Sequence, residues 1–267
     1  MSKQMGLIKL KGNIGGISFY KSGGEDLARM TNGPSKERIQ SDAAFQRTRE
    51  NNAEFGGSAT IAKALRMAFS SVLQGKGDPH FSARLTKVFK EINSKSPGIR
   101  GQRIIALTSY GSLLEGFDFD EKVSFPGIFT APWTLTHDTA RNQSVVSVPA
   151  FLPRDYVKAP AGATSFRLVS AIGVVSDYSY NNESGHYEPA IPEQNTLNAV
   201  VYSAVTLLSA TAPVTFTLTA VLPGTPAIEV QDDCSVVQCL GIEFYQHVDT
   251  TDYVLSQGSC LKVVKVF

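Results

Sequence analysis

The chain has 267 residues, of which 42% are hydrophobic and 18% charged. This composition is ordinary for a globular protein and excludes a wholly disordered chain. No run of about 18 apolar residues is present, so we expect no membrane span. The net charge of +1 conceals an asymmetry, because residues 1–105 hold 18 Lys and Arg against 8 Asp and Glu, whereas residues 106–267 hold 7 against 16.

That division of charge has three interpretations. Nucleic acid could bind the basic end, or the basic end of one subunit could meet the acidic end of another. Alternatively, both surfaces are simply solvated. A basic face for nucleic acid would draw on Arg29, Lys36, Arg38, Arg47, Arg49, Lys63 and Arg66. Acidic residues are interleaved with these and no known nucleic-acid-binding signature accompanies them, so nucleic acid is the weaker interpretation.

Residues 1–32 predict a short, basic β-arm. Apolar and polar residues alternate around the glycines of "KLKGNIGGISFYKSGG", and glycine permits the positive φ angles that tight hairpin turns require. A phosphate-binding loop is excluded, because a Walker motif places its lysine directly after the last glycine, whereas Lys21 follows Gly16 by five residues. A dinucleotide-binding G-x-G-x-x-G would open a helix, but a strand-like run follows here.

Residues 33–105 predict a helical region. The stretch "TNGPSKERIQ" has the composition of a turn-rich linker. A first helix is expected from a cap at Ser41 or Asp42 to Gly56-Gly57, and a second from Ser58 to Gly75. A third follows Asp78-Pro79 and ends at Ser96-Pro97-Gly98. Its apolar residues recur at helical spacing, as they would in a packing seam: Phe81, Leu85, Val88, Phe89 and Ile92.

Residues 106–267 predict an antiparallel β-sandwich, of jelly-roll or immunoglobulin-like type. Seven short runs rich in Val, Thr, Ser and aromatic residues are separated by turn signals. They are "WTLTHD", "SVVSVPA", "SFRLVSAIGVV", "LNAVVYSAVTLL", "VTFTLTAVL", "CLGIEFYQHV" and "CLKVVKVF". The last run ends at Phe267 and is expected to be an edge strand. The fold class is therefore α+β, with a β-arm, a helical layer and a sandwich in that order.

Motifs for catalysis, cofactors and metals are absent from the sequence. The four histidines are scattered, no G-x-S-x-G elbow is present, and the acidic pairs do not follow the calcium-loop pattern. Cys234, Cys239 and Cys260 are expected to be reduced, buried thiols rather than zinc ligands, because "SVVQ" between the first two reads as strand. We therefore expect a protein that is not an enzyme and carries no cofactor.

The segment "DYSYNNESGHYEP" (177–189) mixes aromatic and polar residues in the manner of a recognition loop. An exposed hairpin is the alternative interpretation. Its candidate recognition residues are Tyr178, Tyr180, Asn182, His186 and Tyr187.

Four stretches together resemble a family of uncharacterised proteins common in Bacteroidota and their phages. They are "LKGNIGGISFYKSGGEDLAR", "DAAFQRTRENNAEFGGS", "IRGQR" and "LGIEFYQHV". The resemblance is strongest over residues 9–105 and carries no known activity. It implies a phage-like or appendage origin.

These observations predict a self-assembling structural protein, such as a filament, appendage or virion component, that binds copies of itself or other structural subunits. We expect its arm to add to a strand edge of a neighbour. The start lacks a standard secretory signal, so we expect cytoplasmic synthesis and an extracellular filament or virion as the final site. The alternative is a monomeric β-sandwich that recognises carbohydrate or protein. The residues expected to carry assembly are Lys9, Lys11, Gly12, Gly15, Gly16, Phe19, Tyr20, Arg29, Val263, Val264, Val266 and Phe267.

Overall fold

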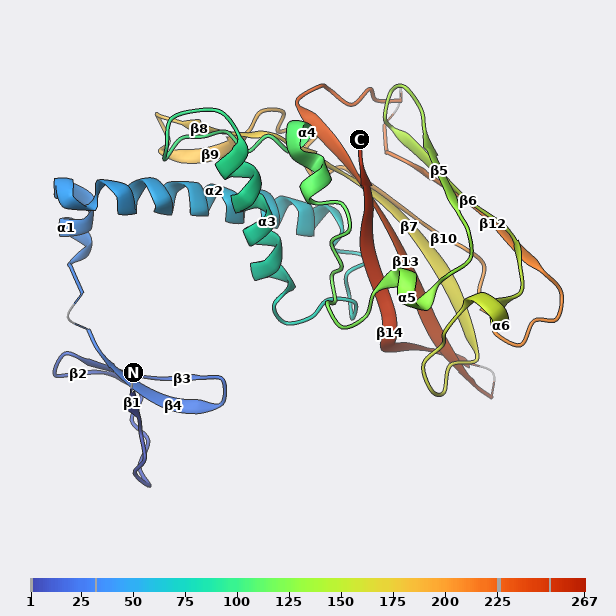
Figure 1. Cartoon of the computed structure of the whole chain (residues 1–267), viewed down its shortest axis with the longest axis horizontal. Helices are drawn as coiled ribbons and strands as arrows, with labels where there is room; N and C mark the ends of the chain where they lie inside the picture. The colour runs from blue at the N-terminus through green and yellow to red at the C-terminus, as the bar shows by residue number, and fades with distance from the viewer. Residues whose placement is uncertain (1, 32, 225–226, 250) are drawn as a thin grey trace. The chain divides into compact units, whose positions relative to one another are not determined.

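The computed structural model describes residues 2–31, 33–224, 227–249 and 251–267, and it is an α+β protein built on antiparallel sheets (Figure 1). The predicted fold class is confirmed. Contacts within the chain define two compact units, Met1–Arg49 and Glu50–Phe267. The predicted boundaries at residues 33 and 106 stay a prediction from composition. Within the described part of the chain, no helix combines the length and the apolar character needed to cross a membrane.

The first unit contains a four-stranded antiparallel sheet with the order β1-β4-β3-β2. Its strands are β1 (Ser2–Lys3), β2 (Gly12–Ile14), β3 (Ile17–Ser22) and β4 (Glu25–Met30). Two-residue turns join β2 to β3 through Gly15-Gly16 and β3 to β4 through Gly23-Gly24. All four glycines have φ between 57° and 83°, as a type I′ turn requires at both positions. The predicted hairpins of the arm are therefore confirmed.

A short helix, α1 (Lys36–Ser41), occupies the stretch that was predicted to be a linker. The backbone N–H of Arg38 donates to Oγ of Ser35 at 3.2 Å, which caps the helix. A 3₁₀ turn (Ala43–Phe45) follows, in which Oδ1 of Asp42 accepts from the N–H of Ala44. The linker prediction was wrong because Ser35 and Asp42 accept hydrogen bonds from the first N–H groups of helical turns, so these residues begin helices rather than an irregular connection.

The next helix, α2 (Gln46–Ala68), runs through Gly56-Gly57, where the sequence predicted a stop. A β-carbon on Gly57 would lie 2.4 Å from Cγ of Tyr187, whereas one on Gly56 would meet nothing within 4 Å. Gly57 is thus a point of close packing between α2 and the 177–189 segment. The predicted break was wrong because tertiary packing, rather than a change of backbone direction, accounts for this glycine.

The second unit contains a five-stranded and a three-stranded sheet. The larger has the order β10-β7-β13-β14, with β11 also paired to β7, and the smaller has the order β12-β6-β5. The strands are β5 (Thr134–His137), β6 (Gln143–Phe151), β7 (Ser165–Ser176), β10 (Asn198–Tyr202), β11 (Thr206–Leu207), β12 (Val214–Val221), β13 (Cys234–Val248) and β14 (Thr251–Val266). All seven predicted runs form strands. A separate hairpin joins β8 (Tyr178–Asn181) to β9 (His186–Pro189).

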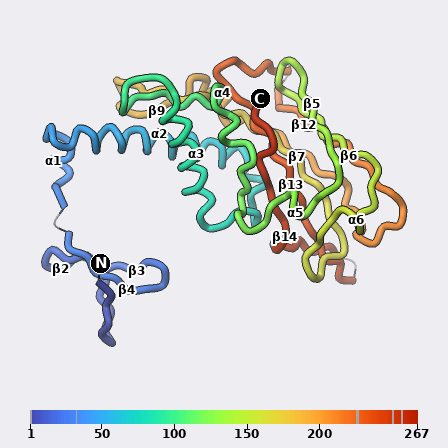
Figure 2. Tube along the Cα trace, in the orientation of Figure 1, coloured from blue at the N-terminus to red at the C-terminus, as the bar shows by residue number. Residues whose placement is uncertain are grey.

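The larger sheet is covered on both faces. Helices α2 and α3 (Phe81–Lys95) lie on one side and the smaller sheet lies on the other (Figures 1 and 2). Val169 and Ala171 of β7 pack in one core with the helices, while Leu168 packs in a second core with β6 and β12. Ile172 belongs to a third core with Ala220 and Leu222. Short helices complete the connections: α4 (Leu107–Tyr110), α5 (Phe125–Ile128) and α6 (Pro153–Tyr156).

The adjacent glycines of α2 give a matched pair of stability tests. We expect Gly57→Ala to lower the melting temperature, because its β-carbon would overlap the Tyr187 ring. We expect Gly56→Ala to raise the free energy of unfolding by up to about 1 kcal/mol, because alanine has a higher helix propensity than glycine at an exposed position inside a helix. Thermal unfolding followed by circular dichroism measures both changes, and equal effects of the two substitutions would contradict this account.

Candidate functional site

The pairing register of the arm sorts its side chains onto two faces. Residues directly opposite one another in adjacent antiparallel strands share a face. Ile14, Ile17 and Met30 form one such row, and Phe19 and Ala28 belong to a second row on the same side, two residues further along. We call these five residues the apolar arm face.

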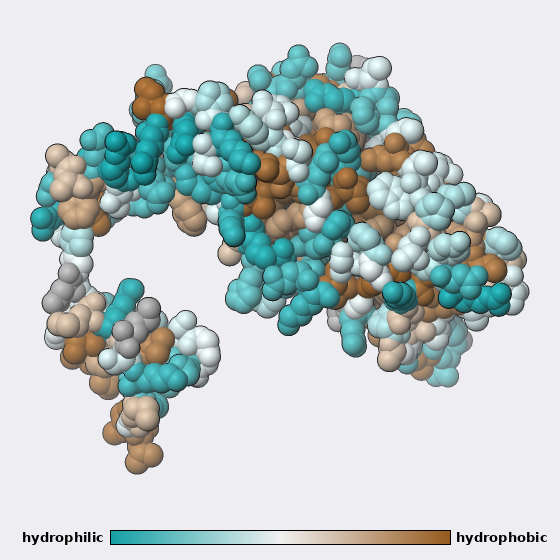
Figure 3. All heavy atoms as spheres, viewed as in Figure 1, coloured by the Kyte–Doolittle hydropathy of each residue, from teal (hydrophilic) through white to brown (hydrophobic). Residues whose placement is uncertain are grey.

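The apolar arm face is largely open to solvent. Ile14 is 58% exposed and Met30 is 71% exposed. None of the described residues from Ser2 to Arg49 reaches the buried class. Figure 3 shows hydrophobic residues at the surface of this unit beside hydrophilic ones. The N-terminal sheet therefore has defined strand pairing without a hydrophobic core.

The other predicted arm residues are dispersed. Tyr20 and Arg29 lie on the opposite face, with the guanidinium carbon 5.5 Å from the ring centroid. Lys9 and Lys11 are exposed in the segment between β1 and β2, where Nζ of Lys9 donates to the carbonyl of Gln4. The structure brings Tyr20 and Arg29 together as a cation–π pair but does not place the two lysines with them. Gly12 begins β2, and Gly15 and Gly16 form its turn.

The C-terminal strand is an edge strand, as predicted, but part of its outer side is occupied. The N–H of Gly116 donates to the carbonyl of Val263 at 2.8 Å, and the N–H of Val263 donates to the carbonyl of Phe117 at 2.9 Å. The N–H of Val266 donates to the Glu115 carboxylate at 3.1 Å. The expectation that Val263–Phe267 offers a free acceptor edge is therefore corrected, because the chain's own 115–119 segment covers it.

The side chains of this C-terminal segment also serve the fold. Val263 is fully buried in the core beside the helices, and Val266 packs against that core. Val264 packs against the second core, and the Phe267 ring stacks on His137 with centroids 4.2 Å apart. Their contacts are internal, so we do not retain them in an assembly surface.

The predicted recognition loop forms the β8–β9 hairpin, and its aromatic residues face inward. Tyr178 and Tyr187 are core residues, exposed by only 3% and 6%. The ring of Tyr180 packs edge-on against Tyr187 at 5.5 Å. Asn182 and His186 are both exposed, and Oδ1 of Asn182 accepts from Nε2 of Gln102. The exposed-hairpin alternative describes the segment better than a recognition loop does.

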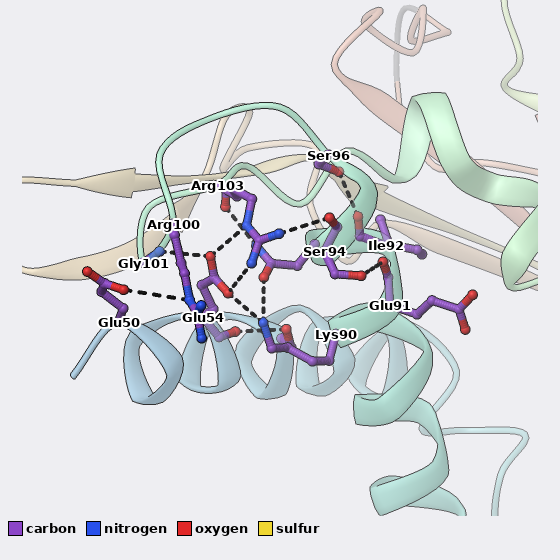
Figure 4. Close-up of polar contacts among 12 residues, drawn as sticks. Glu50, Glu54, Lys90, Glu91, Ile92, Ser94, Ser96, Arg100, Gly101 and Arg103 are labelled. Carbon is purple, nitrogen blue, oxygen red and sulfur yellow. Dashed lines mark hydrogen bonds and ion pairs between the residues drawn. The ribbon is translucent and has the colours of Figure 1, made fainter. Parts of the chain in front are cut away.

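The most concentrated charge cluster of the helical layer surrounds Glu54, which is 1% exposed (Figure 4). Its Oε1 accepts from Nε of Arg103 and from the N–H of Gly101, both at 2.8 Å. Its Oε2 accepts from Nη2 of Arg103 at 2.9 Å and from Nζ of Lys90 at 2.5 Å. One carboxylate thus joins α2, α3 and the loop between α3 and α4.

This cluster joins two of the stretches on which the family resemblance was based. Glu50 and Glu54 lie one helical turn apart in "TRENNAEF", and both pair with arginines of "IRGQR". A β-carbon on Gly101, at φ +93°, would lie 2.9 Å from Cγ of Glu50. In the sequence alone, Glu54 is one of the acidic residues interleaved among the basic ones. The i, i+4 spacing of the two glutamates indicates that they share a helix face, but nothing local in the sequence specifies their arginine partners.

The Glu54 carboxylate is suited to holding the fold rather than to catalysis. Burial opposes its ionisation, but the hydrogen bonds from Arg103, Lys90 and Gly101 outweigh burial and lower its pKa from 4.5 to about 2. Both oxygens are saturated with donors, so no lone pair is directed at a substrate. A general base needs a free lone pair and a pKa near the working pH.

The cysteines are internal. Cys234, Cys239 and Cys260 are buried and form no disulfide. Burial raises the pKa of Cys234 to about 11 and that of Cys260 to about 12. Among the residues that the structure describes, no three His, Cys, Asp or Glu side chains are grouped so as to hold a metal ion.

Glu54→Gln should destabilise the protein by about 3 kcal/mol, because it leaves Lys90 and Arg103 facing an uncharged group. A depressed folded-state pKa contributes stability above the unfolded value, 4.5, that is lost as the pH falls through about 2. The difference in unfolding free energy between wild type and Glu54→Gln, measured by urea unfolding, should therefore be smaller near roughly pH 3 than at neutral pH. Glu91→Gln, in an exposed pair with Lys95, is the control and should change stability by less than about 0.5 kcal/mol. A Glu54 effect no larger than this control would contradict the assignment.

Comparisons with protein-family models, with curated proteins and with solved structures each returned no match.

Proposed function

We propose that this protein is a self-assembling structural protein whose N-terminal unit docks on a neighbouring subunit. The observation that carries the proposal is the exposed apolar arm face on a sheet without a core. Small β-hairpins are marginal in water unless a hydrophobic face is packed against something. A neighbouring subunit would supply that packing.

The energetic argument rests on the side chains of this face. Burying an exposed Ile, Phe or Met side chain is worth about 1.5–3 kcal/mol. Ile14, Ile17 and Met30 are each exposed, so docking them would favour association by several such increments. Part of this gain is offset by the entropy lost on association. The arm gains stability and the assembly gains affinity from the same contacts.

Strand pairing can accompany this packing. In the N-terminal sheet, β2 is an edge strand, bonded only to β3. In the second unit the segment 115–119 blocks β14, whereas β5 and β10 each pair on one side with a neighbouring strand. These two edges, together with β12 at the other end of the three-stranded sheet, are candidate acceptors for an added strand on a neighbouring copy.

Charge and resemblance support the same proposal. The excess of basic residues in 1–105 and of acidic residues in 106–267 suits head-to-tail contacts. A heterologous contact of this kind generates rings or filaments. The likeness to phage and Bacteroidota proteins supports an appendage or virion as the setting. The rival proposal, a binding module that uses the 177–189 loop, loses support because Tyr178 and Tyr187 lie in the core.

A matched pair of arm variants tests the docking face. Ile17 and Ser18 are adjacent in β3 but lie on opposite faces of the sheet. We expect Ile17→Glu to abolish oligomers, because it places a charge in the buried contact, and Ser18→Glu to retain them. Sedimentation velocity of the full-length chain measures both. Monomeric wild-type protein at high concentration, or equal loss in both variants, would refute the proposed face.

Salt tests the electrostatic part separately. We expect oligomers imaged by negative-stain electron microscopy to loosen between roughly 50 mM and 500 mM salt, over which the screening length falls from above to below about 10 Å. Assemblies that are unchanged at high salt would show that apolar docking alone holds the subunits, and would remove the head-to-tail charge argument.

A further inference from the structure

A pocket of about 330 Å³ lies at one end of the five-stranded sheet. Its walls come from the segment that follows α2 and from strands β7, β10, β13 and β14. The residues that matter chemically are Gln74, Lys76, Arg167, Tyr202, Glu243 and Ser259. The volume falls within the range of small-molecule sites, about 300–1,000 Å³.

A buried carboxylate organises this pocket. Oε1 of Glu243 lies 2.6 Å from Nζ of Lys76, and both side chains are almost completely buried. Oε2 accepts from Nε of Arg167 at 2.6 Å and from the Tyr245 hydroxyl at 2.9 Å. Arg167 and Glu243 are directly opposite one another on β7 and β13, so strand register fixes their geometry.

The cluster carries an unbalanced positive charge. Glu243 is the only acid among the described residues that line the pocket, and it faces two cations. Burial opposes ionisation of Glu243, but the hydrogen bond and charge of Lys76, together with Arg167, outweigh burial and lower its pKa. Burial, and then the hydrogen bond to Glu243, raise the pKa of Tyr245, so that phenol stays neutral. An excess of one positive charge in a partly desolvated pocket favours an anionic ligand.

The excess charge resides on Arg167 at the mouth of the pocket. Its side chain is 29% exposed, and its guanidinium carbon lies 3.8 Å from the centroid of the Tyr202 ring. Nε is used by Glu243, whereas Nη1 and Nη2 have no hydrogen-bond acceptor among the described residues. A guanidinium that lies beside the rings of Tyr202 and Tyr245 and keeps its terminal nitrogens free is arranged for a two-point contact with a carboxylate.

We propose that this pocket binds a ligand through a carboxylate that pairs with Nη1 and Nη2 of Arg167. Tyr202, Val254 and Leu255 line the same pocket and offer an apolar surface to the body of the ligand. The carboxylate could belong to a free small acid or to the C-terminus of a peptide. This proposal is independent of the docking of the arm.

The test is a titration of the ¹⁵N-labelled full-length chain, followed by amide chemical shifts. The probe is sodium benzoate, and benzamide is the neutral control of the same shape. Benzoate should give saturable shifts near Lys76, Arg167 and Tyr202, with a dissociation constant on the order of millimolar. N-acetylphenylalanine distinguishes the sources, since tighter binding than benzoate indicates a peptide C-terminus and weaker binding indicates a free acid. No saturable shift, or equal shifts with benzamide, would overturn the proposal.

Variants locate the contact. Arg167→Gln should abolish saturable binding of benzoate. Arg167→Lys keeps the charge and the ion pair with Glu243 but loses the two-point contact, so it should weaken binding roughly ten-fold, and it keeps the test decisive if the glutamine variant fails to fold. Arg154→Gln, at an exposed arginine of α6 outside the pocket, should bind like wild type. Unchanged affinity in the Arg167→Lys variant would overturn the assignment.

Discussion

The fold of the second unit depends on burying both faces of its two central strands, β7 and β13. In β13, twelve consecutive residues from Cys234 to Tyr245 are buried, although successive side chains point to opposite sides of the sheet. A strand of this kind needs one cover for each face. Helices α2 and α3 cover one and the β12-β6-β5 sheet covers the other. Gly173 of β7 shows how close the first cover lies, since a β-carbon there would approach Cζ of Phe69 to 2.9 Å.

Polar contacts secure the places where apolar packing is interrupted. Between the two sheets, the buried amide of Gln238 accepts from Ser144 and donates to Ser170, so no side-chain polar group in that trio lacks a partner. Toward the N-terminal part of α2, the carboxylate of Glu54 gathers Arg103, Lys90 and Gly101. Removing one partner from either group would leave a buried donor or charge unsatisfied. We infer that both groups fix which surfaces pack together, beyond what hydrophobic burial alone specifies.

Local signals in the sequence predicted the elements better than they predicted the contacts. Strand-favouring composition between turn signals identified seven runs that all form strands, and the pair Gly15-Gly16 predicted its turn, because those signals act within a few residues. At Gly57 a glycine led to a wrong prediction of a helix end. This glycine is accounted for by close packing against Tyr187, which is distant in sequence. Tyr178 and Tyr187 read as a recognition loop because composition cannot reveal which face of a hairpin is covered. The ion pairs of Glu54 and of Glu243 join residues at least 36 positions apart, and no local pattern specifies such partners.

The two units differ in how their order is maintained, and this difference is the strongest argument for assembly. In the second unit, three clusters of buried side chains support the strands. In the first, glycine turns set the register of β2, β3 and β4, yet none of the described residues is buried. Turn geometry can fix the pairing register, but the backbone entropy lost when the strands become ordered must be offset by burial of side chains. Because the register places Ile14, Ile17 and Met30 on one side, the N-terminal sheet has the patterning of one half of a packed pair of layers. In the proposed assembly, a neighbouring subunit supplies the other half.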